Sequence, residues 1–347
     1  MTENAIGAGG RLRWIVLLAV TVMVLAGAGL YAVSAFQRLK DTTAGPPAVV
    51  VASERRALPQ GSFVLFRNTA PGQGYGMAAT VSSADPAGPR TIGGAACDRV
   101  YSAGSTVICL TIERGLITKF EASVYGADWQ RIQKWALTGV PSRTRVSGDG
   151  TLAATTVFVT GHSYAGTGFS TETVITRLEG TTTAANLEDF ALLVNGQQVT
   201  APDRNLWGVT FVPGQSDAFY ATAASSGRHW LVRGSIADRT LTAVHDGVEC
   251  PSISPDGTRV AFKKDLGAGI TPYWKAAVLD LASGKETILG ESRGIDDQIE
   301  WLDNSFLLYG LPREGEAGDS DVWRIPADGG GSPELYIEHA WSPSVVR

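Results

Sequence analysis

The sequence predicts an all-β fold: a six-bladed β-propeller of four-stranded blades, closed by the C-terminal strand and preceded by one transmembrane helix. Three observations lead to this prediction. A Pro-Asp-Gly turn recurs in weaker copies, the two ends of the body each hold part of a blade, and an uncharged segment lies near the N-terminus. The composition agrees, because 41 glycines and a charged fraction of only 18% are typical of strands joined by tight turns.

The clearest turn is Pro255-Asp256-Gly257, between two segments of alternating apolar residues. Proline presets φ, the aspartate hydrogen-bonds its own backbone, and glycine accepts a positive φ. The segment therefore predicts a β-hairpin. Weaker copies of this turn lie at Ala103-Gly104, Asp149-Gly150, Gly214-Gln215 and Asp303-Asn304.

These turns recur every 42 to 47 residues, apart from one interval of 65 residues. A period in the forties predicts four short strands per repeat, which is a propeller blade. The long interval predicts an insertion, which we place at residues 180–198. Complete blades begin near residues 97, 142, 206, 249 and 298.

The sixth blade is predicted from the two ends of the body, residues 61–347. Residues 62–92 hold three strands and lack the first strand of a blade, whereas residues 340–344 supply a first strand without its blade. Joined, they complete a ring that leaves no strand edge unpaired.

A known family resembles this pattern. The motif Ser254-Pro255-Asp256-Gly257, followed by Val260-Ala261-Phe262 and by Leu279-Asp280-Leu281 with Gly284, resembles the WD40-like (PD40) repeat of TolB-type six-bladed propellers. The resemblance covers residues 62–347 and implies an exported protein with an N-terminal signal or anchor. TolB-type proteins are periplasmic partners in an envelope complex, but the segment that binds their partner is not recognisable here.

The N-terminal region predicts membrane attachment. Residues 14–37 carry no charge, and as a helix they would span about 36 Å, enough for a hydrocarbon core of about 30 Å. The flanking arginines favour a cytoplasmic tail at 1–13 and an extracytoplasmic propeller on a single-pass cell-membrane protein. Gly45-Pro46-Pro47 and Pro59 predict a linker at 38–60. A cleaved signal peptide is the alternative, because Val33-Ser34-Ala35 fits a cleavage site.

Charge and cysteines narrow the function. The net charge is −5, and the first 57 residues hold six Lys/Arg against three Asp/Glu, so the body is acidic and nucleic-acid binding is not expected. Cys97 and Cys109 lie symmetrically about Ala103, so a hairpin centred there would bring them face to face as a disulfide, which export permits. Two buried free thiols are the alternative, and Cys250 is expected to be a small apolar residue.

One segment resembles a nucleophile elbow. Gly161-His162-Ser163-Tyr164-Ala165 departs from G-x-S-x-G at its last position, and the glycine-broken, β-branched sequence that follows does not predict the required helix. We therefore predict no catalytic role for Ser163.

Neither metal nor cofactor binding is predicted. The four histidines show no paired spacing, and no Cys-x-x-Cys occurs. The acidic group Asp296, Asp297, Glu300 and Asp303 lacks the spacing of a calcium loop, which favours a solvated blade junction.

Propeller geometry places ligand binding on the face that collects the long loops between second and third strands and the links between blades. The residues predicted there are His162, Tyr164, Trp207, Asp246, Asp296, Asp297 and His339. The sequence thus favours a non-catalytic binding or scaffold propeller for a protein, peptide or envelope glycan. The alternatives are an enzyme, either a lactonase- or lyase-like metal site at the central opening or a residual serine hydrolase at Ser163, and a structural envelope component without a discrete ligand.

Overall fold

The computed structural model describes residues 5–54, 57–159, 170–179, 183–267 and 273–347. The chain forms two compact units, Met1–Ala48 with Pro71–Tyr75, and Val49–Ala70 with Gly76–Arg347. Helix α1 (Ala5–Ala44) dominates the first unit, and its segment Leu12–Gln37 is long and apolar enough to cross a membrane, a property that signal sequences share. None of this segment is buried within the protein.

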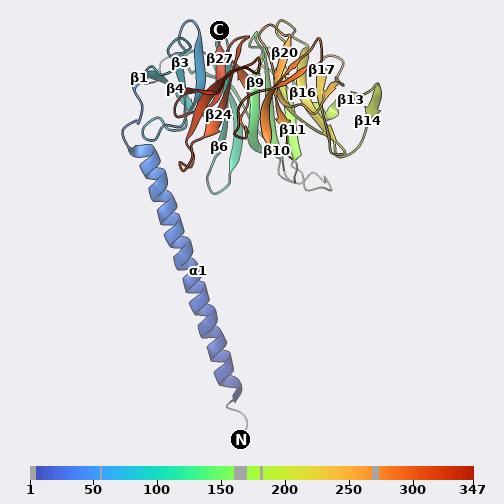
Figure 1. Ribbon diagram of the computed structural model, residues 1–347. Coiled ribbons are helices and arrows are strands. Elements are labelled where there is room, and N and C mark those ends of the chain that lie inside the picture. Colours follow the sequence, from blue (N-terminus) through green and yellow to red (C-terminus); the bar gives the residue numbers. More distant parts are fainter. Residues whose placement is uncertain (1–4, 55–56, 160–169, 180–182, 268–272) are drawn as a thin grey trace. The chain divides into compact units, whose positions relative to one another are not determined.

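The second unit is a six-bladed β-propeller, as the sequence predicts (Figure 1). Each blade is an antiparallel sheet of four strands, and two blades carry additional strands at the outer edge. Blade 1 contains β27 (Ala340–Val346), β2 (Phe63–Asn68), β3 (Met77–Ser82) and β4 (Arg90–Ala96). Blade 2 contains β5 (Arg99–Ala103), β6 (Thr106–Glu113), β7 (Lys119–Tyr125) and β8 (Arg131–Ala136). Blade 3 contains β9 (Val140–Val146), β10 (Leu152–Val159), β11 (Ser170–Arg177) and β12 (Ala184–Asn186). Blade 4 contains β15 (Asn205–Phe211), β16 (Ala218–Ser225), β17 (Arg228–Ser235) and β18 (Thr240–Asp246). Blade 5 contains β19 (Glu249–Ile253), β20 (Arg259–Asp265), β21 (Trp274–Asp280) and β22 (Glu286–Ile288). Blade 6 contains β23 (Glu300–Trp301), β24 (Phe306–Pro312), β25 (Ser320–Pro326) and β26 (Glu334–Ile337).

The C-terminal strand closes the ring. β27 pairs antiparallel with β2, from Phe63 opposite Val346 to Asn68 opposite Ala340, and so becomes the innermost strand of blade 1. The prediction that the two ends of the body share one blade is confirmed.

The recurring turns have one hydrogen-bond pattern. Ser254 Oγ donates to Asp256 Oδ1 at 2.5 Å, and the amide of Thr258 donates to the same oxygen at 3.0 Å. In blade 3 the same contacts have the same lengths, with Asp149 accepting from Ser147 Oγ and from the Thr151 amide. Although burial opposes the charge, these donors lower the pKa of both aspartates. The motif thus fixes the turn between first and second strands in both blades.

The additional strands are the part of the topology that the periodicity does not contain. β1 (Val51–Glu54) pairs parallel with β4 at the outer edge of blade 1. In the predicted insertion, the short helix η1 (Leu187–Asp189) leads into the hairpin of β13 (Ala191–Val194) and β14 (Gln197–Val199). β13 pairs parallel with β18, so this hairpin extends blade 4.

The core lies between neighbouring blades, where the apolar faces of their sheets pack together. One cluster joins Phe63 and Leu65 of blade 1 to Val100, Val107 and Cys109 of blade 2, and all five are nearly inaccessible to solvent. Close packing of this kind holds each blade against the next and keeps the ring rigid.

The predicted disulfide between Cys97 and Cys109 is present, but its geometry differs from the expectation. The hairpin turns at Gly104 rather than at Ala103, because Ala103 pairs with Thr106 and Val100 pairs with Cys109. Cys97 therefore precedes β5, in the link between blades 1 and 2. The bond fastens this link to β6, and Cys250 remains a buried free thiol.

The ring has two faces, named here for use below. The first face carries the turns between strands 1 and 2 and between strands 3 and 4 of each blade. The second face carries the connections between strands 2 and 3 and the links from one blade to the next.

Candidate functional site

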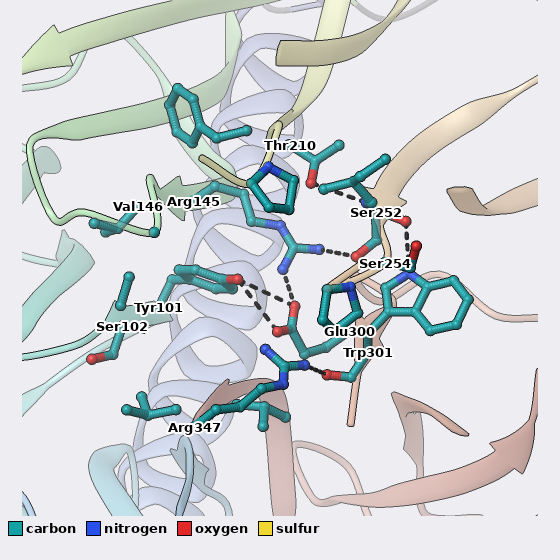
Figure 2. A pocket seen from close by; sticks show the side chains of 18 of the residues that line it. Tyr101, Ser102, Arg145, Val146, Thr210, Ser252, Ser254, Glu300, Trp301 and Arg347 are labelled. Atoms are coloured by element: carbon teal, nitrogen blue, oxygen red, sulfur yellow. Dashed lines mark hydrogen bonds and ion pairs between the residues drawn. The ribbon is translucent and has the colours of Figure 1, made fainter. Parts of the chain in front are cut away.

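A cavity lies at the first-face end of the central opening, and Figure 2 shows it. Its volume is about 290 Å³, and residues from the innermost strands of all six blades line it. The side chains that point into it include a buried arginine, a carboxylate, a tyrosine phenol and the C-terminal arginine. The labelled ones are Tyr101, Ser102, Arg145, Val146, Thr210, Ser252, Ser254, Glu300, Trp301 and Arg347.

Arg145 and Glu300 form the centre of this first-face cavity. The Arg145 guanidinium pairs with Glu300 and also donates to Ser252 Oγ at 3.0 Å and to the Ile299 carbonyl at 2.7 Å. It lies over the ring of Tyr101, with 4.7 Å between the guanidinium carbon and the ring centroid, and the Tyr101 hydroxyl donates to Glu300. These contacts join blades 2, 3, 5 and 6 across the axis.

The charges in this network satisfy one another. Burial and the neighbouring Glu300 raise the pKa of Tyr101 to about 12, so the phenol stays protonated. Burial disfavours the charge of Arg145, but Tyr101 and Glu300 outweigh it and raise the Arg145 pKa. A buried ion pair whose partners are already saturated specifies structure better than it recruits a ligand. We therefore assign this network to the joining of the blades.

The cavity at the second face is different. It has a volume of about 240 Å³ and lies among blades 3, 4 and 5. Two tryptophans, two cations, one free thiol and two carboxylates contribute to its walls. The lining residues are Ser142, Arg143, Phe158, Thr171, Trp207, Glu249, Cys250, Lys263, Trp274 and Asp296. We call it the second-face pocket.

Two buried cations share one exposed carboxylate in the second-face pocket. The side chains of Arg143 and Lys263 are 10% and 4% exposed, whereas that of Asp296 is 87% exposed. Lys263 Nζ lies 3.0 Å from Asp296 Oδ1, and an Arg143 nitrogen lies 3.6 Å from the same oxygen. Desolvation opposes the charge of Asp296, but Lys263 and Arg143 outweigh it and hold the Asp296 pKa below its ordinary value. Both cations thus share this one carboxylate of the pocket lining, and Arg143 also donates to the carbonyl oxygens of Ser142 and Asp296.

The second carboxylate of the pocket has a hydrogen-bond partner of its own. Glu249 is buried and lies 2.9 Å from His229 Nδ1. This hydrogen bond outweighs desolvation and raises the His229 pKa. The His229 ring in turn contacts the ring of Trp207 edge-on, with 5.7 Å between centroids. Glu249 and His229 therefore hold the Trp207 wall in place.

Close approach of two innermost strands shapes the floor of the pocket. Gly208 has a φ of +71°, and a Cβ on it would lie 2.9 Å from the Cα of Cys250. Cys250 itself has a φ of 50°, which is unusual for a residue with a side chain. Its amide is held by Thr222 Oγ1 at 2.9 Å. This contact between β15 and β19 places Trp207 and Cys250 side by side in the wall of the pocket.

The predicted ligand residues do not form one site. Trp207 and Asp296 meet in the second-face pocket, but Asp297 is fully buried and binds Arg99 at 3.0 Å. Asp246 pairs with Arg228 at the end of β18, and His339 Nδ1 lies 2.6 Å from Asp319. His162 and Tyr164, like Ser163, lie outside the described residues.

Sequence reasoning missed Arg143, Lys263 and Trp274. They come from three different strands, so no local motif joins them. A signal was present for the first of them, since Arg143 and Arg145 alternate in a strand predicted to be innermost, where a charged side chain must point into the central opening.

The donor sets give no support to a metal centre. Within the described part of the chain, no group of three or more His, Cys, Asp or Glu residues is arranged to hold a metal ion. Glu300 at the first face and Asp296 at the second are both paired with basic side chains, and a cation beside a carboxylate opposes metal binding there.

No protein-family model and no curated protein matches the chain. Among solved structures, TolB from Acinetobacter baumannii is similar with a TM-score of 0.57 and 14% identity, over 83% of this chain and 67% of that one. The chain has a TolB-like fold. Less similar are a putative TolB from Agrobacterium tumefaciens (TM-score 0.48, 11% identity, 70% and 82% of the two chains) and a puromycin-hydrolysing peptidase from Mycobacterium tuberculosis (0.46, 14%, 76% and 41%). At these identities the likeness of the TolB-like chain concerns its fold and not its activity.

Proposed function

We propose that this chain is a non-catalytic, extracytoplasmic binding propeller that its N-terminal helix holds at the cell membrane. Its ligand is an acidic group of a protein, peptide or envelope glycan, bound in the second-face pocket. The observation that carries this proposal is the arrangement of Arg143 and Lys263, two buried cations whose common carboxylate, Asp296, is exposed.

The chemistry of the second-face pocket fits a carboxylate flanked by an apolar or sugar surface. Lys263 Nζ lies over the ring of Trp274, 5.1 Å from its centroid, so cation and aromatic face are presented together. A ligand carboxylate would take the position of Asp296 and form charge-assisted hydrogen bonds, while its carbon skeleton packs on Trp207 and Trp274. The volume of about 240 Å³ suits one amino-acid or sugar residue, and not a long segment.

Binding of small carboxylates to the full-length chain tests this proposal. N-acetylglycine represents a peptide terminus and glucuronate an acidic sugar, with N-acetylglycinamide as the uncharged control for the first. Calorimetry should detect binding of at least one acid and none of the amide. Absence of binding by both acids would contradict the proposal.

Two variants move the affinity in opposite directions. Lys263→Gln should weaken binding by about 10–100-fold, because a charge-assisted hydrogen bond is lost. Asp296→Asn should strengthen binding several-fold, because it removes the internal anion that competes with the ligand. Lys134→Gln, which removes a lysine bound to Glu121 outside the pocket, is the matched control and should change nothing. An unchanged affinity in Asp296→Asn would show that the acid binds elsewhere.

The serine-hydrolase alternative has its own test. A fluorophosphonate probe labels an activated serine, and we expect no labelling that depends on Ser163. Labelling that disappears in Ser163→Ala would replace the binding proposal with a hydrolase.

A further inference from the structure

One hairpin of the propeller ends in two highly exposed apolar side chains. β6 and β7 pair through seven successive residue pairs, from Val107 opposite Tyr125 to Glu113 opposite Lys119. At the tip, Leu116 is 106% exposed and Ile117 is 75% exposed, and Leu116 is the most exposed large apolar residue among the described residues. The long, regular ladder between β6 and β7 thus holds this apolar tip in a fixed position, where it is exposed to solvent.

The tip belongs to the second face, since it joins the second and third strands of blade 2. In Figure 1 this hairpin, beside the label β6, extends beyond the ring on that side. Two other large, partly exposed apolar residues also lie at strand ends on the second face. Phe158, near the end of β10, is 41% exposed, and Leu266, directly after β20, is 49% exposed.

The size of the tip favours a lipid surface over a protein. Stable protein interfaces bury on the order of 1,000 Å² or more, far more than two side chains at a hairpin end can supply. The interfacial region of a bilayer accepts isolated apolar side chains without a complementary surface. Charge does not select the partner either, because Arg114 and Lys119 are offset by Glu113 and by Asp98, which lies 3.9 Å from Arg114.

The chain itself keeps a bilayer close, if its helix is the membrane anchor proposed above. After Gln37 the helix continues to Ala44, about 10 Å, and the six residues before Val51 span at most about 25 Å. Such a short tether gives the propeller a high effective concentration at the membrane, so that weak insertion is sufficient.

We propose that Leu116 and Ile117 insert into the interfacial layer of the membrane that anchors this chain, so that the second face is turned toward the membrane. The second-face pocket then opens toward ligands at the membrane surface. The insertion is apolar, so it does not require anionic lipid.

The test uses the full-length chain in nanodiscs, with an environment-sensitive fluorophore on Leu116→Cys. The matched control is Ala282→Cys, an exposed position in the turn between β21 and β22 on the first face. The unsubstituted chain serves as the labelling blank, because Cys250 is buried. Equal thermal melting of both variants confirms folding.

We expect blue-shifted emission and several-fold stronger quenching by doxyl-labelled lipid at position 116 than at 282, in zwitterionic and anionic discs alike. Water-like emission at 116 in both discs overturns the proposal. Protection of 116 in native membrane vesicles but not in pure lipid also overturns it, and assigns the tip to a protein. Either result leaves the carboxylate-binding experiments unaffected, since Leu116 lies outside the second-face pocket.

Discussion

The carboxylate of Asp297 accepts a hydrogen bond from the backbone amide of Ser342 at 3.1 Å. The same oxygen accepts from the Gly310 amide at 3.1 Å, and the other oxygen binds Arg99 at 3.0 Å. One buried side chain in the link between blades 5 and 6 thus joins blade 6, the closing strand β27 and blade 2. Asp297 is a structural residue of the ring closure and not part of a solvated acidic junction.

Asp297→Asn should destabilise the propeller by about 3–5 kcal/mol, because it leaves the Arg99 guanidinium buried without its counter-ion. The matched control is Asp246→Asn, which breaks an ion pair whose two side chains are 58% and 72% exposed and should cost no more than about 1 kcal/mol. Urea unfolding measures both. Equal midpoints would show that Asp297 does not hold the closure.

Deleting residues 338–347 should leave the chain unfolded or aggregated. The deletion removes β27, uncovers the edge of β2 and takes the buried side chains Ala340, Val345 and Val346 from the core. A domain with a net stability of about 5–15 kcal/mol does not tolerate such a loss. Deletion of residues 1–48, which keeps β1, should give a folded soluble domain. A truncated chain that melts like the intact one would disprove closure by β27.

Reduction of the disulfide between Cys97 and Cys109 should lower stability by about 3 kcal/mol, the value expected for closing a loop of this length. Non-reducing peptide mapping should find the two peptides linked in protein purified without reductant. The thiol of Cys250 is free, so the variant Cys250→Ala should respond to reductant in the same way as the parent chain. Two free thiols at positions 97 and 109 would contradict the structure.

Glu188 should make the stability depend on pH. Burial raises the pKa of this carboxyl from its ordinary 4.5 to about 7, although Arg204 opposes the shift. Because the folded state favours the protonated acid, stability should fall as the pH rises from about 4.5 to about 7 and stay low above that.

Glu188→Gln should therefore be more stable than the parent chain at pH 8, by about 1–2 kcal/mol after solvent screening, and equal to it below pH 4.5. Glu314→Gln, at an exposed position, should not change the profile. Thermal melts of both chains across this pH range measure the effect. Parallel profiles of melting temperature against pH for the parent chain and Glu188→Gln would disprove the raised pKa of Glu188.

Much of the ring could be predicted from local turn chemistry. Asp149 and Asp256 make the same contacts because Ser, Asp, Gly and Thr recur at the same offsets, so the sequence records the turn directly. β1 and β13 were not predictable in this way. Both join their blades in parallel, which depends on contacts distant in the sequence and leaves no periodic pattern.

The second-face pocket was harder to predict, because blade geometry and not local sequence brings its parts together. Lys263 lies in β20 and Asp296 in the link between β22 and β23, and Arg143 comes from blade 3, more than a hundred residues earlier in the chain. The sequence prediction chose residues from the loops and links that lie on the second face. Such residues are distributed around the whole rim of the ring and do not meet at one site. Of the predicted residues that the structure describes, only Trp207, near the start of β15, and Asp296, in the link before β23, meet in the second-face pocket.

The parallel strand β1 also has a mechanical consequence. After helix α1 the chain enters the propeller through β1, which is hydrogen-bonded along the outer edge of blade 1, the blade that β27 closes from the inside. If α1 is the membrane anchor proposed above, a pull between membrane and propeller first loads the hydrogen bonds that join Gly45 and Ala48 to Gln73 and Pro71, and then the ladder between β1 and β4. That ladder can detach while β2, β3, β4 and β27 remain paired. It would lengthen the tether by several residues under force and return when the force ends, with the ring intact throughout.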